Sequence, residues 1–270
     1  MPADPVPRLI GVLHLLPLPG APTPSPGLLE VEERAVADAQ VLWSGGFRAA
    51  ILENLGDAPF SRGSVGPEVV AAMTRIAGAV RRACPELRLG INVLRNDATS
   101  ALAVASTVGA AFVRVNVLSG ASWTDQGLIQ SAARDLLLLR RRLEADGGPF
   151  IQIFADICVK HGVSAGAVDP IREARDVAGR GGADCVIVSG SGTGEATDLS
   201  GLSDLRAAAG VPVLVGSGVT MASAQQTAAL ADGAIVGTAL HMDGELSLPL
   251  CGDRVRAMVR AFEPADSPTR

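Results

Sequence analysis

The sequence predicts a single (β/α)8 barrel, and two observations support this. Eight short β-branched runs recur along the 270 residues, and each is followed by a segment with helical periodicity. The centres of most runs are continuously apolar, which is typical of parallel strands covered on both faces. Eight such units over about 250 residues match a barrel better than an open doubly wound sheet. We expect one barrel domain over residues 1–270, with a core of about residues 8–262 and short flexible termini.

The expected strands are short, and their centres read Val-Ile-Val, Val-Leu-Val or Ile-Val in several cases. They are Arg8–His14, Arg48–Asn54, Leu87–Leu94, Ala111–Val117, Phe150–Ile157, Asp184–Ser189, Val211–Gly216 and Asp232–Gly237.

The segments between the strands contain residues that begin or end helices. Pro67 takes a first helical position, and Asp97 is the expected N-cap of a helix that ends at Gly109. Asp169 and Pro170 open a later helix. The expected helices are Leu28–Trp43, Glu68–Cys84, Ala98–Val108, Thr124–Ala145, Ile171–Ala178, Asp204–Ala209, Met221–Leu230 and Gly252–Phe262.

The composition argues against several classes of protein. A formal net charge of −5, 3% aromatic residues and no Tyr make a nucleic-acid partner unexpected. No apolar run reaches the roughly 18 residues of a membrane helix, and the first residues lack the pattern of a signal peptide. We therefore expect a cytoplasmic protein with no membrane partner. The four separated cysteines are expected to be mostly buried thiols: Cys84, Cys158, Cys185 and Cys251.

Polar residues gather where the expected strands end, and barrels of this kind carry their active sites at that end. The candidate catalytic residues are His14, Glu53, Asn92, Arg114, Asn116, Asp156, Lys160 and His161. Glu53 and Asp156 are expected to move protons, and each histidine is a candidate proton shuttle. Asp57 and Asp97 are further acid–base candidates.

Arg114 is expected inside the barrel, because the alternation of a strand places it and Asn116 on the same side as Phe112. An isolated buried charge is very unfavourable, so Glu53, Asp156 or a ligand anion is the expected partner of Arg114. Stabilisation of negative charge during a reaction and a purely structural ion pair remain alternative roles.

Lys160 is the single Lys of the sequence and lies just beyond the fifth expected strand. It could form a Schiff base with a carbonyl substrate, contact a phosphate or be solvated. No cofactor is assigned from the sequence. A divalent metal stays an alternative, although the sequence contains neither the H-x-H nor the H-E-x-x-H spacing that is typical of metal ligands. Its candidate ligands are His14, Glu53, Asp57, Asp156 and His161.

Glycine-rich turns follow the last three expected strands. Glycine lets backbone N–H groups approach an anion closely, and a neighbouring Ser or Thr hydroxyl can donate a further hydrogen bond. Barrels that bind phosphorylated small molecules often hold the phosphate beside strands seven and eight. The expected phosphate-binding residues are Gly190, Gly192, Gly216, Ser217, Gly218, Gly237 and Thr238.

Seven motifs lie at or beside the expected strand ends. They are His14–Gly20, Glu53–Phe60, Asn92–Asp97, Phe112–Val117, Thr124–Gly127, Asp156–His161 and Val215–Thr220. In this order, and over the span from Leu9 to Phe262, the motifs resemble the BtpA family. One position departs from the resemblance, since Leu16 stands where a basic residue is frequent in that family.

The resemblance implies a barrel of the ribulose-phosphate-binding type. Members of the family are linked to photosystem I accumulation in cyanobacteria, and bacterial relatives occur with sugar-uptake genes. Three functions compete: an enzyme, a non-enzymatic assembly or stability factor, and a binding protein for a phosphorylated metabolite. The enzyme would act on a phosphorylated sugar or nucleotide-like metabolite by isomerisation, aldol cleavage or glycosidic bond cleavage. The polar groups that converge on one end of the barrel favour the enzyme, and a homo-oligomer formed through apolar helical faces is a further expectation.

Overall fold

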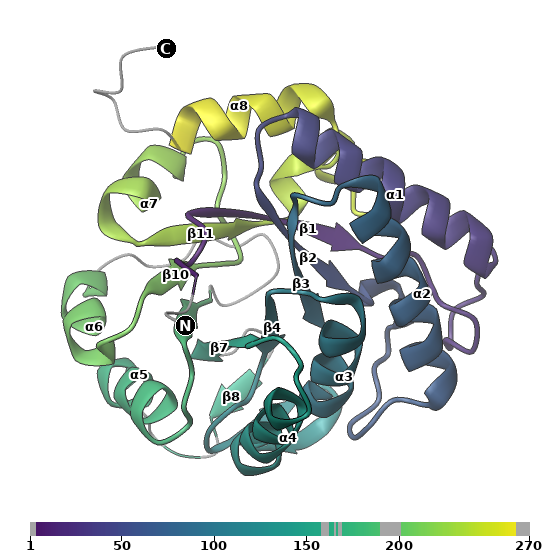
Figure 1. The fold of residues 1–270 in the computed structure, drawn as a ribbon. Coiled ribbons are helices and arrows are strands. Elements are labelled where there is room, and N and C mark those ends of the chain that lie inside the picture. Colours follow the sequence, from purple (N-terminus) through teal and green to yellow (C-terminus); the bar gives the residue numbers. More distant parts are fainter. Residues whose placement is uncertain (1–3, 158–161, 165, 167–168, 190–200, 263–270) are drawn as a thin grey trace.

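The computed structural model describes residues 4–157, 162–164, 166, 169–189 and 201–262. Within these residues, eight parallel strands close into a barrel in the spatial order β1-β11-β10-β9-β7-β4-β3-β2. Figure 1 looks along this barrel and shows the helices arranged around its outside. The predicted (β/α)8 barrel is confirmed.

The strands and helices of the barrel follow the predicted order, and apart from the start of α4 their ends differ from the expected ones by a few residues. The barrel strands are β1 (Leu9–His14), β2 (Ala49–Glu53), β3 (Arg88–Asn92), β4 (Phe112–Val115), β7 (Gln152–Ile157), β9 (Cys185–Val188), β10 (Val213–Val215) and β11 (Gly233–Val236). The helices are α1 (Leu28–Ser44), α2 (Pro67–Ala83), α3 (Ala98–Val108), α4 (Ala133–Ala145), α5 (Pro170–Gly179), α6 (Leu202–Ala209), α7 (Ala224–Leu230) and α8 (Gly252–Phe262).

Several predicted helix signals act as expected. The Asp97 carboxylate accepts a hydrogen bond from the backbone N–H of Ser100 at 3.0 Å, and α3 ends at Gly109 in the left-handed conformation. The Asp169 carboxylate accepts from the N–H of Ile171 at 3.0 Å. Asp97 therefore stabilises a helix end, as the N-cap prediction had it.

The predicted helix Thr124–Ala145 is wrong over its first part. Residues Ala121–Thr124 (β5) and Gly127–Gln130 (β6) form an antiparallel hairpin, and only Ala133–Ala145 is helical. Gly127 adopts a φ of 96°, which a right-handed helix excludes. Strand β5 also pairs with β8 (Gly162–Ser164), so a three-stranded sheet accompanies the barrel.

The interior of the barrel is filled by apolar side chains from alternate positions of the strands. Phe112 and Phe154 stack there with their ring centroids 4.4 Å apart. The rings have room because β3 carries Gly90, where a Cβ atom would lie 2.2 Å from the Phe112 ring. The other alternate positions, such as Leu13 and Leu52, pack outward against the helices. Sequence alternation thus separates an inner core from a larger core under the helices.

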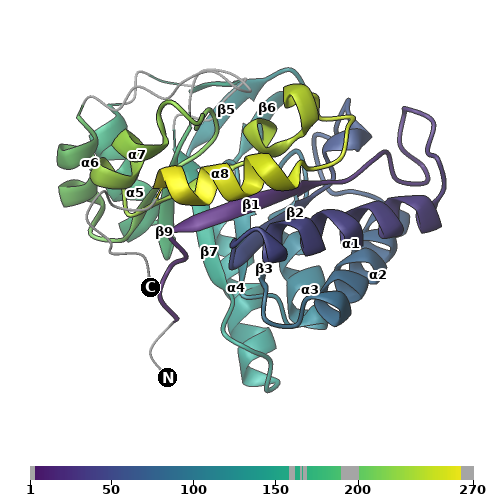
Figure 2. The same cartoon turned by 90° about the horizontal axis from the view of Figure 1, so that it is seen from above.

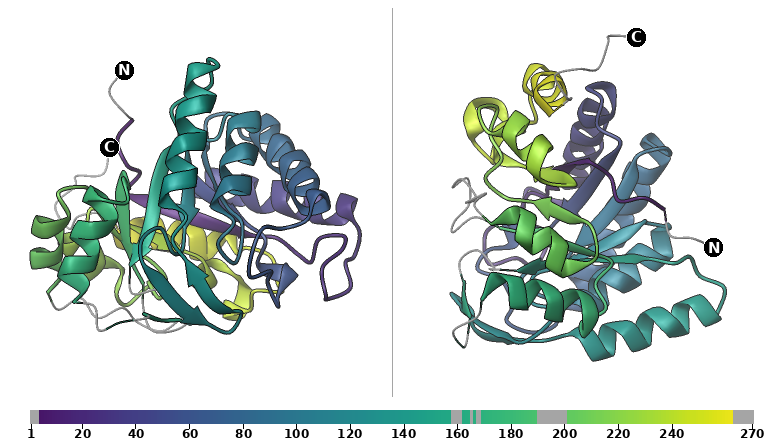
Figure 3. Two further views of the ribbon diagram at one scale, coloured as in Figure 1. Left: turned by 90° about the horizontal axis from the view of Figure 1, so that it is seen from below. Right: turned by 90° about the vertical axis from the view of Figure 1, so that its left-hand side faces the viewer.

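The first and last units of the chain meet where the barrel closes. Strand β1 pairs with β11 in parallel, and Figure 2 shows α1 and α8 side by side on the outside. Figure 3 shows α4 next to α3 and extending past it. Among the helices of the described ranges, none is long and apolar enough to cross a membrane.

Candidate active site

The inward-facing positions of the barrel strands change from apolar to polar at the carboxyl ends. On β1, Ile10 and Val12 face the interior and His14 is the next residue in phase. On β4, Arg114 follows Phe112 in the same way. The residues in phase at these ends are His14, Glu53, Asn92, Arg114, Asn116, Asp156, Ser189, Gly216 and Gly237. A polar layer therefore lies on the apolar inner core.

Strand register brings three of these side chains together at the start of the barrel. His14 of β1 is the register partner of Glu53 of β2, and Glu53 is the register partner of Asn92 of β3. Register partners on neighbouring strands lie about 5 Å apart, so their side chains are in reach of one another. The Asn92 side-chain amide donates to Glu53 Oε2 at 2.6 Å.

Asp156 is buried and holds three neighbouring polar groups. It accepts hydrogen bonds from Arg114 Nε at 3.1 Å and Arg114 Nη2 at 3.0 Å, a bidentate pair. It also accepts from Asn116 Nδ2 at 2.5 Å and from the Ser189 hydroxyl at 3.2 Å. With these contacts, and since it does not line either cavity described below, Asp156 positions Arg114 and Asn116.

Arg114 lies between the two carboxylates that the sequence suggested as its partners. Its Nη1 atom is 3.9 Å from Glu53 Oε2, and the bidentate pair with Asp156 fixes the other side of the guanidinium. Burial alone would lower the pKa of Arg114, but the charges of Asp156 and Glu53 raise it above its ordinary value. The predicted pairing is confirmed, and Arg114 is a permanent cation in this layer.

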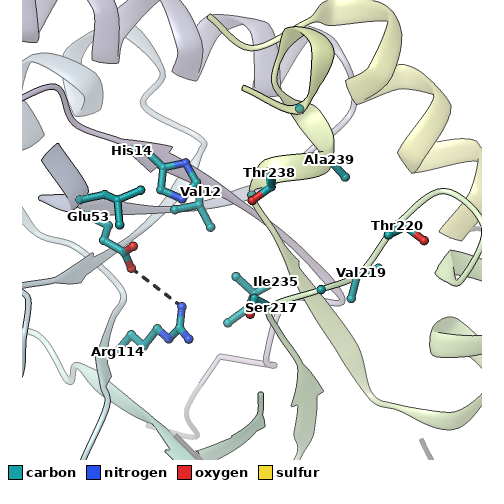
Figure 4. A pocket seen from close by; sticks show the side chains of 14 residues that line it. Val12, His14, Glu53, Arg114, Ser217, Val219, Thr220, Ile235, Thr238 and Ala239 are labelled. Carbon is teal, nitrogen blue, oxygen red and sulfur yellow. Dashed lines mark ion pairs between the residues drawn. The ribbon is translucent and has the colours of Figure 1, made fainter. Parts of the chain in front are cut away.

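A cavity of about 150 Å³ opens above the polar layer and joins both halves of the barrel. Glu53 and Arg114 lie on one side of it, and Ser217 and Thr238 on the other, as Figure 4 shows. Its walls are Val12, His14, Glu53, Leu55, Arg114, Ser217, Gly218, Val219, Thr220, Ile235, Gly237, Thr238, Ala239 and Gly244. Four of the predicted phosphate-binding residues therefore face three of the predicted catalytic ones.

Two glycines in this region allow close packing. A Cβ atom on Gly237 would lie 2.7 Å from His14 Cε1, so glycine lets the β11 end approach the histidine ring. A Cβ on Gly216 would lie 2.7 Å from the Cβ of Ile235. The Gly216 N–H donates to the Val188 carbonyl at 2.9 Å, so that in this conformation it is not available to an anion.

A second cavity, of about 470 Å³, lies toward β3 and β4. It shares Glu53, Leu55 and Arg114 with the first cavity, so the two meet at the Glu53–Arg114 ion pair. Its remaining walls are Ala58, Phe60, Leu94, Arg95, Asn116, Asp125 and Leu246.

His14 is linked to the third histidine of the chain, which the sequence analysis did not select. His241 Nδ1 lies 2.7 Å from the Leu248 carbonyl oxygen, which can only accept, so Nδ1 of His241 carries the hydrogen. In neutral His241 the Nε2 atom is then an acceptor, and His14 Nδ1 donates to it over 3.0 Å. Burial lowers the pKa of His241 and keeps it neutral near pH 7. The Nε2 atom of a neutral His14 is consequently the proton-accepting nitrogen.

Other predicted site residues lie elsewhere or outside the described ranges. Asp57 accepts from the Leu18 N–H at 2.8 Å and from Asn54 Nδ2 at 2.9 Å, so it joins the first loop to the β2 end. Burial raises the pKa of Asp57, while these two hydrogen bonds lower it in part. The predictions for Lys160, His161, Gly190 and Gly192 concern residues outside the described ranges.

Arg95 and His241 are ionisable residues of the site that were not selected from the sequence. Arg95 was visible as part of Asn92–Asp97, but its position three residues past β3 gave no indication of the direction of its side chain. Nothing in the sequence places His241 beside His14. In the described part of the chain, no three His, Cys, Asp or Glu side chains gather as they would to hold a metal ion.

Comparison with solved structures supports the fold. Phosphoribosyl anthranilate isomerase from Thermus thermophilus aligns with a TM-score of 0.56 at 12% identity, over 94% of this chain and 98% of its own. Thiamine phosphate pyrophosphorylase from Pyrococcus furiosus also gives 0.56, at 13% identity, over 94% and 95% of the two chains. At these identities the likeness extends to the barrel fold alone.

Sequence comparison identifies nearer relatives. Photosystem I biogenesis protein BtpA of Synechocystis sp. is 43% identical over 255 residues, which covers 94% of this chain and 87% of that protein. An uncharacterized protein of Pyrococcus horikoshii is 45% identical over 230 residues, or 85% of this chain and 86% of the other. The model of the BtpA family matches residues 6–264. With a match of that extent and identities of this order, the chain belongs to the BtpA family.

Proposed function

We propose that this protein is an enzyme acting on a phosphorylated sugar or nucleotide-like metabolite. The observation that carries the proposal is the first cavity, in which Ser217, Gly218 and Thr238 face Glu53 and Arg114. A phosphate would bind at the end lined by glycine and hydroxyl groups, away from the Glu53 carboxylate. The sugar carbons would then lie beside the ionisable groups.

Glu53 is the group best placed to move a proton. It lines the cavity, while Asn92 and Arg114 hold its Oε2 side. His14, with Nε2 as the accepting nitrogen, is a second proton-transfer group on the same cavity. Arg114 is a fixed cation that would stabilise an oxyanion or enediolate formed as the proton leaves carbon.

Proton transfer beside a carbonyl is the reaction that these groups support best, either as an isomerisation or within an aldol-type cleavage. Glycosidic bond cleavage usually uses two carboxylates on opposite sides of the bond. Of the residues described, only Glu53 supplies a carboxylate to the first cavity. The two barrel enzymes compared above are named phosphoribosyl anthranilate isomerase and thiamine phosphate pyrophosphorylase. Both names refer to phosphorylated compounds, which is the substrate class proposed here.

The proposed phosphate site is tested by calorimetric titration with ribose 5-phosphate and with ribose. Thr238→Val removes the hydroxyl without changing the side-chain shape, and a hydrogen bond to a charged group is worth about 1.5–3 kcal/mol. We expect ribose 5-phosphate to bind about tenfold or more weakly to Thr238→Val. Thr107→Val on the exposed face of α3 is the matched control and should bind like the parent protein.

The catalytic part of the proposal is tested separately with Glu53→Gln. The measurement uses a phosphate ester that the parent protein converts to product. Glu53→Gln should bind this substrate as the parent does, while turnover falls by about 10²–10⁴-fold. The proposed function would be overturned if Thr238→Val bound ribose 5-phosphate as tightly as the parent protein does. It would also be overturned if the parent protein bound ribose and ribose 5-phosphate with equal affinity. A role as an assembly factor would instead depend on the outer surface and tolerate both substitutions.

A further inference from the structure

The second cavity contains a buried acceptor that lacks a partner among the described residues. Asn116 is 2% exposed, and its Oδ1 atom makes no hydrogen bond there. The orientation of the amide is set by Asp156, whose ionised carboxylate only accepts, so the NH2 group of Asn116 must face it. Oδ1 is therefore the side-chain atom of Asn116 that Asp156 does not hold. Since Asn116 forms part of the cavity wall, a ligand that donates an N–H or O–H to this residue would satisfy it.

Arg95 supplies the complementary donors in the same cavity. Its side chain is buried to 4% exposure and forms part of the wall, together with Asn116. The guanidinium is planar and carries several N–H donors, which suit a carbonyl oxygen or a flat ring. The wall of this cavity thus includes both an acceptor and a group of donors.

The remaining wall is largely apolar. Leu55, Phe60, Leu94 and Leu246 line it, which favours a flat hydrophobic body over a hydrated sugar. A second phosphate fits poorly, because at neutral pH its oxygens mostly accept and would leave Asn116 Oδ1 unsatisfied. The carboxylates of Glu53 and Asp125 face the same cavity and would repel it.

We propose that the second cavity binds the heterocyclic base of a nucleoside phosphate. A base presents an N–H donor next to a carbonyl or ring-nitrogen acceptor, and proteins bind bases by such edge contacts and by stacking on aromatic or guanidinium planes. The N–H donates to Asn116 Oδ1, and the acceptor receives a hydrogen bond from Arg95. Because the two cavities meet at Glu53 and Arg114, the sugar lies beside that ion pair. This inference rests on the proposed function for the phosphate end.

The experiment compares three kinds of probe by calorimetric titration: ribose 5-phosphate, the four common nucleoside 5′-monophosphates, and the four free nucleosides. At least one monophosphate should bind about tenfold or more tightly than ribose 5-phosphate. Phe60→Ala, on a half-buried loop position, and Arg95→Gln should each remove most of that gain. Phe60→Ala, which changes no charge, should not alter the affinity for ribose 5-phosphate by more than about twofold.

The outcomes separate the two proposals. If no nucleotide binds more tightly than ribose 5-phosphate, or if the gain survives in Phe60→Ala, the base site is wrong and the phosphate site stands. If the free nucleosides bind, Phe60→Ala weakens them and phosphate adds nothing, the base site stands and the proposed phosphate site is wrong. Circular dichroism of Arg95→Gln reports whether that variant folds. If it does not fold, the nucleotide affinity of Phe60→Ala alone tests the base site.

Discussion

Two consecutive hydrogen bonds connect the Leu248 carbonyl to His241 and His241 to His14. Because each nitrogen in the chain has one assigned role, the ring of His14 is held in one tautomer by a side chain that does not line the first cavity. Asp38 of α1 adds to this arrangement, since its carboxylate accepts from the Leu250 N–H at 3.0 Å and so anchors the segment that follows His241.

The buried state of His241 makes the stability of the protein depend on pH. Burial lowers the pKa of His241 below its ordinary value of 6.5, so the unfolded chain binds this proton more readily than the folded one. The contribution of neutral His241 is fully present above pH 6.5 and is lost as pH falls through the lowered folded pKa. We expect the free energy of unfolding to decrease over that range, measured by urea titration at several pH values.

His241→Gln provides the control for this prediction. A glutamine amide can accept from His14 and donate to Leu248 but does not titrate, so the pH dependence should become flatter in this variant. An unchanged dependence would show that other groups cause it. His241→Leu, which removes both hydrogen bonds, should be less stable than His241→Gln at every pH above 6.5.

The residue-level prediction from sequence succeeded where strand alternation carries the information. The position of Arg114 relative to Phe112 was sufficient to place it inside the barrel, and the need to neutralise a buried cation led to Glu53 and Asp156. Arg95 and His241 lie beyond strand ends, where the chain direction is set by loop packing. Alternation says nothing about such positions.

Among the elements, the hairpin β5–β6 marks the limit of reasoning from periodicity. The apolar residues of 124–145 repeat at helical spacing in the part that became α4, and that signal was extended backward over two short strands. The reliable local signal was Gly127, which ends a two-residue connection and adopts a positive φ. Pairing of β5 with β8 depends on residues about 40 positions apart and cannot be seen locally.

Helix α4 packs on the barrel with one fully buried side chain and several partly buried ones. Leu136 is its single fully buried residue, at 0% exposure, whereas Leu138 is 37% exposed. Leu136→Ala should therefore destabilise the protein by about 2–5 kcal/mol, and Leu138→Ala by less than about 0.5 kcal/mol. Denaturant titration of both variants measures the difference. Similar values for the two would mean that α4 is held by contacts other than the buried leucine.

At the scale of the whole molecule, the barrel fold was predictable because every unit repeats the same signal. Continuous apolar runs and helix-ending glycines agree along the chain, so errors at one unit, such as the hairpin, left the topology unaffected. The inner packing was not predictable, since it depends on which side chains from different strands meet. Phe112, Phe154 and Gly90 show this, as each comes from a different strand.

The substitution of glycine by alanine should have opposite effects in the tight inner core and in an outer helix. Gly90→Ala places a methyl group 2.2 Å from the Phe112 ring and should destabilise the protein by about 1–3 kcal/mol or more. Gly78→Ala lies inside α2, where the new Cβ approaches only Arg82 Nη1 at 3.4 Å. It should stabilise by about 0.5–1 kcal/mol, because alanine favours helix.

Thermal and denaturant unfolding of the two alanine variants measure this pair. A neutral Gly90→Ala would show that the phenylalanine stack can shift at little energetic expense. The interior of the barrel would then be less densely packed than the structure indicates.

The ion pairs of the polar layer come from β2, β4 and β7, whereas Phe60 and Leu246 lie on connections outside the barrel strands. Charge placement and wall shape are thus encoded by separate parts of the chain. Exchanging the loop side chains would alter which molecule is accepted while the charged machinery keeps its geometry. A protein organised in this manner is a favourable starting point for redesign, in which new selectivity is sought by varying a handful of loop positions.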